Sequence, residues 1–492
     1  MPMALPIALY STAQVRALDA HAIEELKIPG YTLMKRAGEA ALRYLRTRYP
    51  LAHHIVIVGG HGNNAGDGYV LARFAQAAGL TVSVLAAAPP EELKGDARQA
   101  YEDFKAGEGT LRPFAAEHLR AGEVIVDAIL GTGLKGAVRE DLATVIRAIN
   151  GAGTPVFSLD VPSGLDSDTG TAAGEAIRAD ATVTFVGLKT GLYLGDGPEY
   201  AGTLFFDDLG LGDAPQLAPR LIRIIEAEIH AALPQRPRAA NKGDFGRVLI
   251  VGSGPGMPGA TRLAGEACLR VGAGLVTVAV APENITAIVA GRPELICVAV
   301  SNEAVLAAAV TRADLVAIGP GLGRTPWARA ALRLVLGSGK PLVVDADALN
   351  LLAEGGEPAR SNWILTPHPG EAGRLLGVST ADVQDDRLAA LDRLVDRYHG
   401  TIVLKGAGTL VGAAGRTPGL CERGNPGMAT AGTGDVLTGT IAGILAQCRD
   451  PWAAARAGVL VHAMAGDAAA RGGERGVLAG DLVRELRRYV NL

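Results

Sequence analysis

Short apolar runs rich in β-branched residues alternate along the whole chain with alanine-rich segments of helical length that carry arginine and glutamate. This alternation is typical of a parallel sheet covered by helices. In the first half the apolar runs span residues 54–60, 81–87, 123–129, 155–161, 181–187 and 202–208. In the second half they span residues 246–253, 274–280, 314–321, 341–348, 363–370 and 401–408. The pattern predicts the α/β class, with a complete doubly wound sheet in each half.

Two proline-rich segments with weak periodicity, 211–219 and 233–246, separate the halves, so the boundary should fall near 213–240. At about 150 residues per domain, a chain of 492 residues allows three domains as well as two large ones. Because the strands form two series, we predict two domains, at 1–215 and 225–492.

Composition narrows the class of protein. The 65 glycines and the aromatic share of 4% fit small-residue turns beside buried strands. The net charge of −4 gives no basic excess for nucleic acid or anionic membranes, so neither is an expected partner. The four cysteines form no CxxC pair, no apolar stretch reaches about 18 residues, and the N-terminus lacks the pattern of a signal peptide. We predict a cytoplasmic enzyme that acts on small molecules.

A glycine-rich turn follows the first strand, at the edge where open α/β sheets bind their ligands. Gly60, Gly62 and Ala65 fit the loose dinucleotide fingerprint G-x-G-x-x-A. An ordinary NAD-binding fold would also place a carboxylate at the end of the next strand, and this chain has Ala86 to Ala88 there. The turn therefore indicates phosphate binding but argues against an ordinary dehydrogenase.

Polar side chains collect at this turn and at two later strand ends. They are Asn63, Asn64, Asp67, Asp127, Asp160, Ser163 and Asp166. An Asx-turn with a helix cap at Asp67 would explain the first group without a ligand. Together, however, amide, carboxylate and hydroxyl oxygens suit a hard cation better than a transition metal.

Three motifs, GNNAGDG (62–68), VDAILGTGL (126–134) and DVPSGLD (160–166), resemble the NAD(P)H-hydrate epimerase domain, which usually has glycine where this chain has Ala65. The resemblance implies a Rossmann-like three-layer α/β/α domain. It implies that a potassium ion is bound by Asn64, Asp127 and Ser163. It also implies that the hydrated dinucleotide is contacted by Asn63, Asn64, Ala65, Gly66, Asp67, Gly131, Thr132, Gly133, Leu134, Lys135, Gly136, Ala137 and Asp160. We interpret Asp160 as the candidate for proton transfer at nicotinamide C6.

Lys189 follows in the segment FVGLKTG (185–191), where a lysine beside glycines suggests a phosphate ligand. The order GLKT, however, lacks the Gly-Lys-Ser/Thr sequence of a P-loop. We expect a surface lysine whose aliphatic stem covers apolar neighbours.

The second half opens with a strand, a Gly/Pro turn and a helix in which Ala260 and Ala264 permit close approach. GPGLG (319–323) and DADALN follow later strands. In the latter, Asp345 and Asp347 could assist Mg²⁺, but helix capping and turn roles explain them at least as well. We leave both aspartates outside the predicted site.

A histidine at a later strand end is a ligand candidate. In LTPHPGEAGRLLG (365–377), Pro367 and Pro369 fix the backbone around His368. Glu371 would favour the first turn of the helix that follows, through the helix dipole.

Two glycine-rich turns near the C-terminus suit a nucleotide. Lys405 to Thr409 (KGAGT) could hold a phosphate through one cation and several N–H groups, and a plain β-hairpin turn is the alternative. In AGTGDVLTG (431–439), three small residues lead into a predicted helix with Asp435 in its first turn. A helix-capping role would explain Asp435 but not the three small residues before it.

Taken together, these motifs resemble the ribokinase-like superfamily, and PHPGE with KGAGT and AGTGDVLTG is similar to its ADP/ATP-dependent NAD(P)H-hydrate dehydratase branch. The resemblance implies a ribokinase-like α/β domain that uses Mg²⁺ and in which Asp435 removes a proton from an alcohol. The implied hydrate site comprises Ala260, Gly321 or Gly323, His368 and Asp435. The implied adenine-nucleotide site comprises Lys405, Gly406, Ala407, Gly408, Thr409 and Gly434.

The two resemblances together imply a bifunctional repair enzyme for hydrated NADH and NADPH. The first domain would interconvert the (R) and (S) epimers at C6. The second would phosphorylate the C6 hydroxyl of the (S) epimer, with ADP or ATP as donor, and expel phosphate to restore NAD(P)H. A small-molecule kinase with a regulatory first half and a non-catalytic nucleotide sensor are the alternatives. By analogy with fused bacterial and archaeal family members, we expect ADP as donor and a homo-oligomer, tetrameric or larger.

Overall fold

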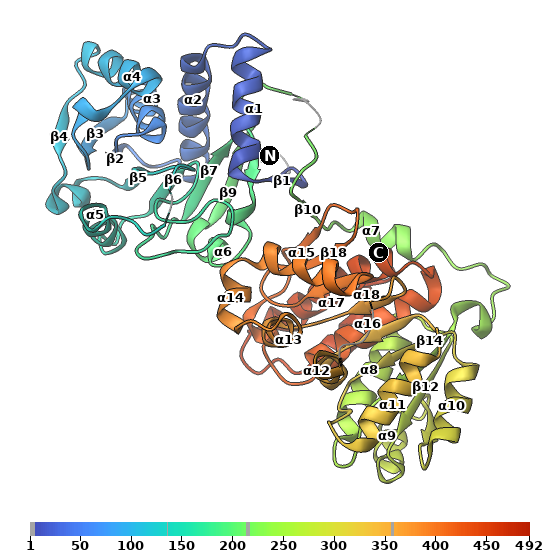
Figure 1. Cartoon of the computed structure of the whole chain (residues 1–492). Helices are drawn as coiled ribbons and strands as arrows, with labels where there is room; N and C mark the ends of the chain where they lie inside the picture. The colour runs from blue at the N-terminus through green and yellow to red at the C-terminus, as the bar shows by residue number, and fades with distance from the viewer. Residues whose placement is uncertain (1–4, 135, 213–216, 356–358) are drawn as a thin grey trace. The chain divides into compact units, whose positions relative to one another are not determined.

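The chain divides into two compact units, Met1–Leu221 and Ile222–Leu492 (Figure 1). The structure is a computed structural model, and it describes residues 5–134, 136–212, 217–355 and 359–492.

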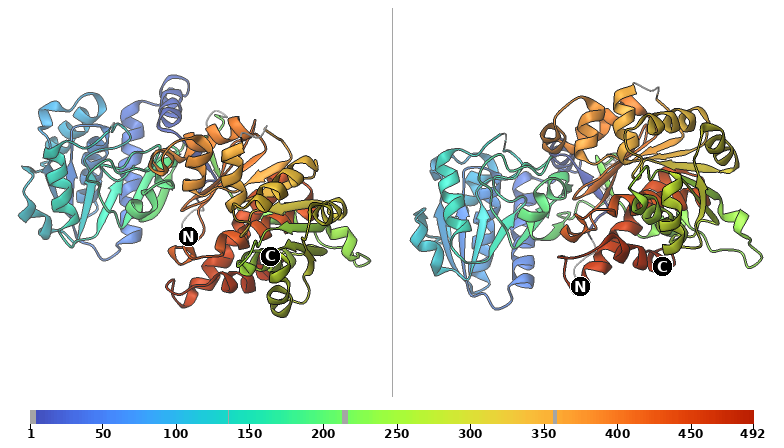
Figure 2. Two further views of the ribbon diagram at one scale, coloured as in Figure 1. Left: turned by 60° about the horizontal axis from the view of Figure 1, so that its bottom comes forward. Right: turned by 90° about the horizontal axis from the view of Figure 1, so that it is seen from below.

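The first unit is a parallel sheet between two layers of helices (Figure 2). Its strands, in the spatial order β4-β3-β2-β5-β6-β7-β9, are β2 (His54–Gly59), β3 (Thr81–Ala86), β4 (Leu111–Pro113), β5 (Val124–Ala128), β6 (Val156–Leu159), β7 (Ala181–Phe185) and β9 (Thr203–Asp207). Its helices are α1 (Thr12–Glu24), α2 (Gly30–Arg48), α3 (Asn63–Ala77), α4 (Gly95–Ala106), α5 (Glu140–Asn150) and α6 (Gly197–Ala201).

Side chains that point alternately to opposite faces of this sheet pack against a layer of helices on each face. Ile55 and Ile57 of β2 belong to the core that contains α2, α3 and α4, whereas Val56 and Val58 belong to the core that contains α5. Successive side chains of a strand point to opposite faces, so a strand that is apolar at every position is buried on both. The three-layer α/β/α arrangement that the sequence predicts is confirmed.

A short N-terminal strand closes one side of this unit. β1 (Ala8–Tyr10) pairs in parallel with β8 (Leu188–Lys189), and the register places Tyr10 opposite Lys189. The segment around residue 189 is therefore covered by the first residues that the structure describes.

The second unit contains a larger sheet in which the strands follow the order β13-β12-β11-β14-β15-β16-β17-β18-β19-β10. The pairs are parallel from β13 to β17, antiparallel from β17 to β19, and parallel between β19 and β10. The strands are β10 (Leu221–Arg223), β11 (Arg247–Val251), β12 (Leu275–Val280), β13 (Ile296–Ala299), β14 (Leu315–Ile318), β15 (Leu342–Val344), β16 (Trp363–Leu365), β17 (Thr401–Leu404), β18 (Thr409–Ala413) and β19 (Gly419–Cys421).

Helices pack on both faces of this sheet. They are α7 (Ala227–Ala232), α8 (Pro258–Arg270), α9 (Ile285–Gly291), α10 (Glu303–Arg312), α11 (Pro326–Gly337), α12 (Ala346–Gly355), α13 (Pro369–Leu376), α14 (Thr380–Asp385), α15 (Arg387–Tyr398), α16 (Thr433–Cys448), α17 (Pro451–Ala469) and α18 (Ala479–Tyr489). Val411 of β18 faces the core that contains α8, α16 and α17, while its neighbour Gly412 packs against Leu391 of α15.

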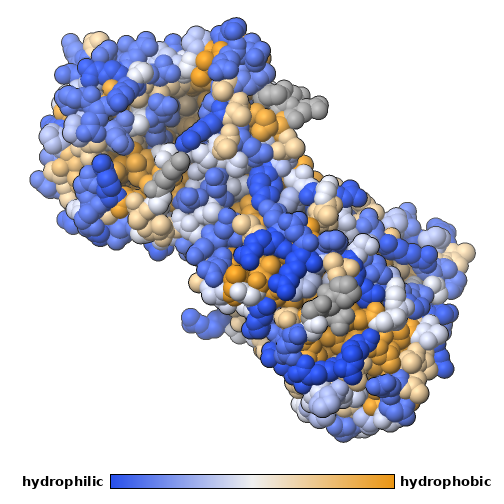
Figure 3. Space-filling model, viewed as in Figure 1, coloured by the Kyte–Doolittle hydropathy of each residue, from blue (hydrophilic) through white to orange (hydrophobic). Residues whose placement is uncertain are grey.

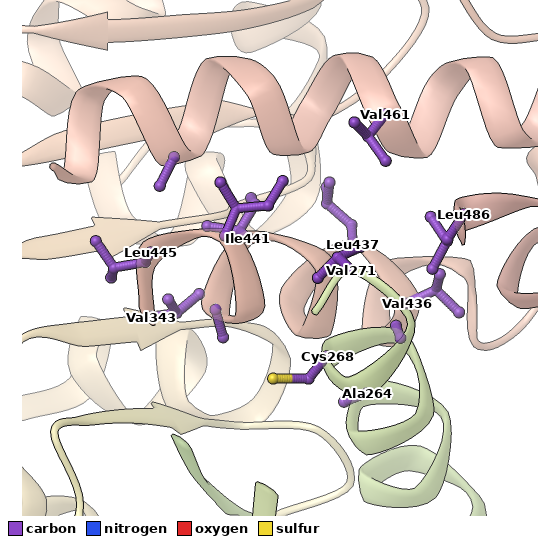
Figure 4. Close-up of a cluster of buried hydrophobic side chains, with 14 of the residues drawn as sticks. Ala264, Cys268, Val271, Val343, Val436, Leu437, Ile441, Leu445, Val461 and Leu486 are labelled. Carbon is purple, nitrogen blue, oxygen red and sulfur yellow. The ribbon is translucent and has the colours of Figure 1, made fainter. Parts of the chain in front are cut away.

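Helix α16 lies at the centre of the core of the second unit. Every residue from Val436 to Ala446 is buried, which is expected of a helix enclosed on all sides. Figure 4 shows its side chains between those of α8, α17 and α18, with Val343 of β15 beneath them. The position of the first turn of α16 is therefore fixed by packing along the rest of the helix.

The predicted α/β class is confirmed, since each of the twelve apolar runs contains a strand. The strands of the described residues that lie outside these runs were not predicted; they are β1, β4, β8, β10, β13, β18 and β19. β4 and β13 have three and four residues, too few to establish an alternating pattern.

The described residues contain no helix with the length and apolar character that a membrane crossing requires. The visible surface is mainly hydrophilic, with hydrophobic side chains in separate groups (Figure 3).

We predict that Gly439→Ala destabilises the second unit by about 1–3 kcal/mol, because overpacking forces neighbouring backbone apart. A Cβ at Gly439 would lie 1.9 Å from the carbonyl oxygen of Ala264 in α8. The measurement is the midpoint of thermal unfolding of that unit. Gly480→Ala in α18 is the matched control, because a Cβ there meets nothing within 4 Å. Equal midpoints for the two variants would contradict the prediction.

Candidate active sites

The first candidate site is a cavity of about 620 Å³ at the carboxyl ends of β2, β5 and β6. The residues predicted for the dinucleotide that line it are Asn63, Asn64, Asp67, Gly131, Thr132, Gly133, Leu134, Ala137 and Asp160. Ala65 and Gly66 are buried in α3 and do not line this cavity, and neither does Gly136. Lys135 lies outside the described residues.

The glycine-rich turn after β2 lets the backbone approach the next strand end. A Cβ at Gly60 would lie 2.1 Å from the carbonyl oxygen of Ile129. Helix α3 begins at Asn63 with Gly62 as its N-cap, and no side chain caps it. The alternative that Asp67 is a helix cap is therefore wrong, because this residue lies in the second turn of α3.

The three predicted potassium ligands are linked to one another directly or through the carbonyl of Leu130. The buried Asp127 carboxylate accepts hydrogen bonds from the Ser158 hydroxyl at 2.8 Å and from the Ser163 amide at 2.9 Å. The Ser163 hydroxyl lies 2.5 Å from Asp127 and 2.8 Å from the amide nitrogen of Leu130. Burial raises the pKa of Asp127 above its usual value, although the hydrogen bonds from Ser163 and Ser158 oppose the shift.

Asn64 adds an oxygen without a partner to this group. Its Nδ2 donates to the carbonyl oxygen of Leu130 at 2.8 Å, while its buried Oδ1 has no hydrogen-bond partner among the described residues. An unsatisfied buried oxygen is unfavourable, so a cation at this point would remove a penalty.

Asp160 lies beside a lysine that the sequence led us to place at the surface. Lys189 is only 1% exposed, and its ammonium donates to Asp160, to the Thr184 hydroxyl at 3.0 Å and to the Phe185 carbonyl at 2.8 Å. The surface assignment is wrong, because pairing of β8 with the distant strand β1 buries Lys189. Asp160 itself has a φ of +66°, in the left-handed region.

The carboxyl groups of Asp67 and Asp19 interact with the charges of Asp160 and Lys189. Burial raises the pKa of Asp67 well above its usual value, and the charges of Asp160 and Asp19 raise it further. Burial also raises the pKa of Asp19, in α1, to about 6. No sequence motif indicated Asp19, because it lies in an ordinary helix far from the glycine-rich motifs.

The second candidate site lies at the start of α16, near the carboxyl ends of β15, β16 and β17. Gly432 is the N-cap of α16 with a φ of +90°, and no side chain caps the helix. The alternative that Asp435 is a capping residue is therefore wrong. Burial and the charge of Asp345 raise the pKa of Asp435 to about 7, although Lys405 opposes the shift.

Lys405 joins the carboxylates of this site. Its ammonium lies 2.7 Å from Asp345 and 3.7 Å from Glu371, and Asp345 also accepts from the Thr438 hydroxyl at 2.7 Å. A Cβ at Gly434 would lie 3.7 Å from the Lys405 nitrogen. Burial alone would raise the pKa of Asp345, but Lys405 and Thr438 together lower it. Asp345, which we left outside the predicted site, is thus paired with Lys405 of that site.

His368 is the N-cap of α13. Its Nδ1 accepts from the amides of Gly370 at 3.0 Å and Glu371 at 3.4 Å, so the proton of the neutral ring is on Nε2. Nε2 lies 3.5 Å from Glu371, and half of the side chain is exposed. Burial and the charge of Lys405 lower the pKa of His368. Burial raises the pKa of Glu371 to about 7, although Lys405 opposes the shift.

The turn that we predicted to hold a phosphate has the conformation of a β-hairpin, which the sequence analysis gave as its alternative. Lys405 to Gly408 connect the antiparallel strands β17 and β18, and Thr409 begins β18. The buried Arg387 donates to the carbonyl groups of Leu404 at 3.3 Å, Lys405 at 3.4 Å and Gly408 at 3.2 Å. Gly406 has a φ of +138°, and a Cβ there would lie 2.5 Å from the Arg387 guanidinium. The sequence did not reveal Arg387.

The remaining residues predicted for the hydrate site, Ala260, Gly321 and Gly323, lie at the start of α8 and in the turn after β14. A Cβ at Gly321, which has a φ of +58°, would lie 3.0 Å from the Cβ of Ala260 at the start of α8. The amide of Gly323 donates to Asp347 at 2.8 Å. Asp347 therefore has the turn role that the sequence allowed for it.

Comparisons with known proteins cover both units. The chain matches a family model described as NAD(P)H-hydrate dehydratase over residues 248–488 and one described as YjeF-related protein N-terminus over residues 30–191. A bifunctional NAD(P)H-hydrate repair enzyme of Coxiella burnetii is 48% identical over 486 residues, which cover 98% of this chain and 99% of the relative. The enzyme of the same description from Escherichia coli is 43% identical and covers 100% of this chain and 95% of the relative.

Solved structures resemble the second unit. A ribokinase-like superfamily protein of Enterococcus faecalis has a TM-score of 0.53 at 32% identity, covering 56% of this chain and 98% of its own. The ADP/ATP-dependent NAD(P)H-hydrate dehydratase of Bacillus subtilis, co-crystallised with ATP and Mg²⁺, has a TM-score of 0.50 at 30% identity, covering 55% and 97%. These structures and the family model confirm the ribokinase-like fold predicted for the second half.

We predict that His462→Gln removes part of the acid sensitivity of the fold. The His462 ring, in α17, donates to the Thr433 carbonyl at 2.9 Å, and burial lowers its pKa from 6.5 to about 4. Below pH 6.5 the unfolded chain therefore binds a proton that the folded chain does not, and stability falls until pH 4. His462 should therefore lower the free energy of unfolding by about 2 kcal/mol at pH 5 relative to pH 8.

The measurement is the urea midpoint at pH 5 and pH 8. His462→Gln keeps a hydrogen-bond donor and should show a smaller difference between the two midpoints. His230→Gln, at an exposed histidine in α7, is the control and should behave as the wild type. The same difference in all three proteins would contradict the prediction.

Proposed function

The chain belongs to the family of bifunctional NAD(P)H-hydrate repair enzymes, and from this premise we propose how its residues divide the two reactions. It is an NAD(P)H-hydrate epimerase and an NAD(P)H-hydrate dehydratase. We assign the epimerase to residues 1–215 and the dehydratase, with an adenine nucleotide as co-substrate, to residues 225–492. The observation that carries the assignment of the dehydratase site is Asp435, which has no capping role and lies with Gly434 beside Lys405 at the start of α16.

The chemistry of the hydrate explains the need for a nucleotide. Its C6 carries a hydroxyl group, and hydroxide is a poor leaving group. In the mechanism that we propose, Asp435 takes the hydroxyl proton while the terminal phosphoryl group is transferred to the oxygen. Phosphate then leaves from C6 with the bonding electron pair, C5 loses its proton, and the C5=C6 double bond forms again.

The residues around Asp435 have supporting roles. The N–H groups at the start of α16 face the transferring phosphoryl group, and the hairpin from Lys405 to Thr409 holds the nucleotide. Because the Lys405 ammonium is already paired with Asp345, this hairpin would bind mainly through its N–H groups. Ala260, Gly321, Gly323 and His368 are proposed for the hydrate.

The oxygens around Asn64 fit a potassium ion. Asn64 Oδ1 has no partner among the described residues, and the Asn64 amide is linked through the carbonyl of Leu130 to the hydroxyl of Ser163, which bonds to the carboxylate of Asp127. A monovalent cation there would balance the buried carboxylate and fix the turn that begins at Gly131. We propose Asn64, Asp127 and Ser163 as its ligands.

The residues of the second unit do not form a ready magnesium site. Asp345 already accepts from Lys405 and Thr438, and Asp347 accepts from the Gly323 amide. We expect Mg²⁺ to arrive with the nucleotide phosphates, as is common for this ion, and no step of the mechanism runs through it. A homo-oligomer, a cytoplasmic location and ADP as the preferred donor stay predictions.

We predict that mixed NADHX epimers are converted to NADH only when a nucleotide is added. The measurement follows the absorbance of reduced nicotinamide and the release of phosphate with ADP, with ATP and with neither. Asp435→Asn should lower the rate by about 10²–10⁴-fold, the range for loss of a general base. It should leave epimer interconversion unchanged. Asp160→Asn should instead slow epimer interconversion and leave the nucleotide-dependent dehydration of the (S) epimer unchanged. Restoration without nucleotide would exclude the mechanism, and a stable phosphorylated product would indicate a kinase instead.

We predict that the dehydratase rate falls below neutral pH. A base must be ionised to take a proton, and the Asp435 pKa is about 7. At pH 6 about one tenth of the molecules would have this base ionised, so kcat/KM should be about tenfold below its alkaline plateau. The measurement is initial rate against pH at saturating nucleotide, with nucleotide affinity followed over the same range as a control. A flat profile between pH 6 and 8 would contradict Asp435 as the base.

A further inference from the structure

The Lys189 ammonium of the epimerase cavity is a fixed charge. A lysine has three N–H donors and no acceptor, and here they reach Asp160 Oδ1, the Thr184 hydroxyl and the Phe185 carbonyl. The side chain is 1% exposed. Lys189 lines the cavity, but its donors are already used, so its main action is on the carboxylate beside it.

Asp160 uses its two oxygens differently. Oδ1 accepts from Lys189, from the Thr184 hydroxyl at 3.3 Å and from the Phe185 amide at 3.4 Å. Oδ2 has no hydrogen-bond partner in the part of the chain that the structure describes. A Cβ added at Gly131 would lie 3.8 Å from Oδ2, so this oxygen faces the glycine-rich turn that lines the cavity. One oxygen anchors the carboxylate and the other is available to a ligand.

More negative groups than positive ones converge on this point. Asp19 of α1, Asp67 of α3 and Asp160 all line the cavity and act on one another through their charges, and the cation Lys189 acts on both Asp19 and Asp67. The other charged or titratable residues of the described lining are Arg16, His61, Asp96 and Arg139. Like charges at such a site favour retention of a proton by one carboxyl group.

Epimerisation at C6 needs both an acid and a base. The hydroxyl-bearing carbon is bonded to the ring nitrogen, so protonation of the hydroxyl lets it leave as water with the electron pair of the C–O bond. The nitrogen lone pair then forms a C6=N double bond. A water molecule adds to the opposite face of C6 and gives up a proton, which returns the hydrate with the other configuration.

We propose that Asp67 is the proton donor and Asp160 Oδ2 the proton acceptor of this exchange, with Lys189 as the positioning residue that holds the other oxygen of Asp160. The proposal rests on the epimerase function assigned to this cavity. Stability alone gives no reason for a buried lysine, because well-packed apolar residues often replace buried ion pairs without loss. The raised pKa of Asp67 is consistent with a carboxyl group that carries the exchangeable proton.

The test measures epimer interconversion by the full chain without nucleotide, from pure (S)-NADHX, after subtraction of the rate without protein. Lys189→Met should slow interconversion about 100-fold at pH 7, since the Asp160 carboxylate loses the ammonium that holds it in place. Lys189→Arg should recover part of the rate. Lys94→Met, at an exposed lysine of the same unit, is the matched control and should behave as the wild type.

Asp67→Asn tests the donor with a side chain of the same shape. It should slow interconversion by a similar factor and remove the alkaline limb of the pH profile, because no carboxyl group is left to ionise there. Wild-type rates and limbs in Asp67→Asn would overturn the proposal, whatever the folding of the Lys189 variants. So would a Lys189→Met variant that interconverts the epimers at the wild-type rate.

The nucleotide-dependent conversion of (S)-NADHX by each variant reports on the second unit and should stay unchanged. Failure of the epimerase assignment itself would appear differently, as a wild-type chain that does not interconvert the epimers at all.

Discussion

A lysine ammonium largely withdrawn from solvent and paired with an aspartate at the end of a parallel strand is the interaction on which both candidate sites depend. Lys189 pairs with Asp160 in the first unit, and Lys405 pairs with Asp345 in the second. Removing two charges from water has a penalty of several kcal/mol per ion, which is offset only where further hydrogen bonds surround the pair. In both places threonine hydroxyls, Thr184 and Thr438, provide them. The charges of the two sites are thereby fixed before any substrate arrives.

The sequence predicted what depends on neighbouring residues and failed where burial depends on distant ones. Strands and glycine-rich turns are local patterns, so the two sheets and the strand ends that carry Asn64, Asp127 and Ser163 could be predicted. The burial of Lys189 could not be predicted, because the strand β1, which covers it, is far from it in the sequence. Arg387 and His462 bond to backbone carbonyl groups, which every residue has and no sequence motif marks.

Glycine N-caps explain why the two acidic residues near helix starts are free for chemistry. Gly62 and Gly432 begin α3 and α16 without a side-chain cap, so neither Asp67 nor Asp435 is used to satisfy the first N–H groups of its helix. The sequence allowed a capping role for both, because aspartate is common at helix starts. Only the backbone conformation decides between the two roles, and at Gly432 a φ of +90° favours glycine as the cap.

The bonds from Arg387 to the hairpin between β17 and β18 have a consequence for the entropy of ligand binding. A loop that orders only when its ligand arrives loses conformational freedom at that moment, and the loss subtracts from affinity. Here the carbonyl groups on both sides of the turn are held by a buried guanidinium during folding. For the nucleotide that we propose at this hairpin, the free energy of binding is therefore available to align the terminal phosphate with its acceptor, rather than to shape the loop.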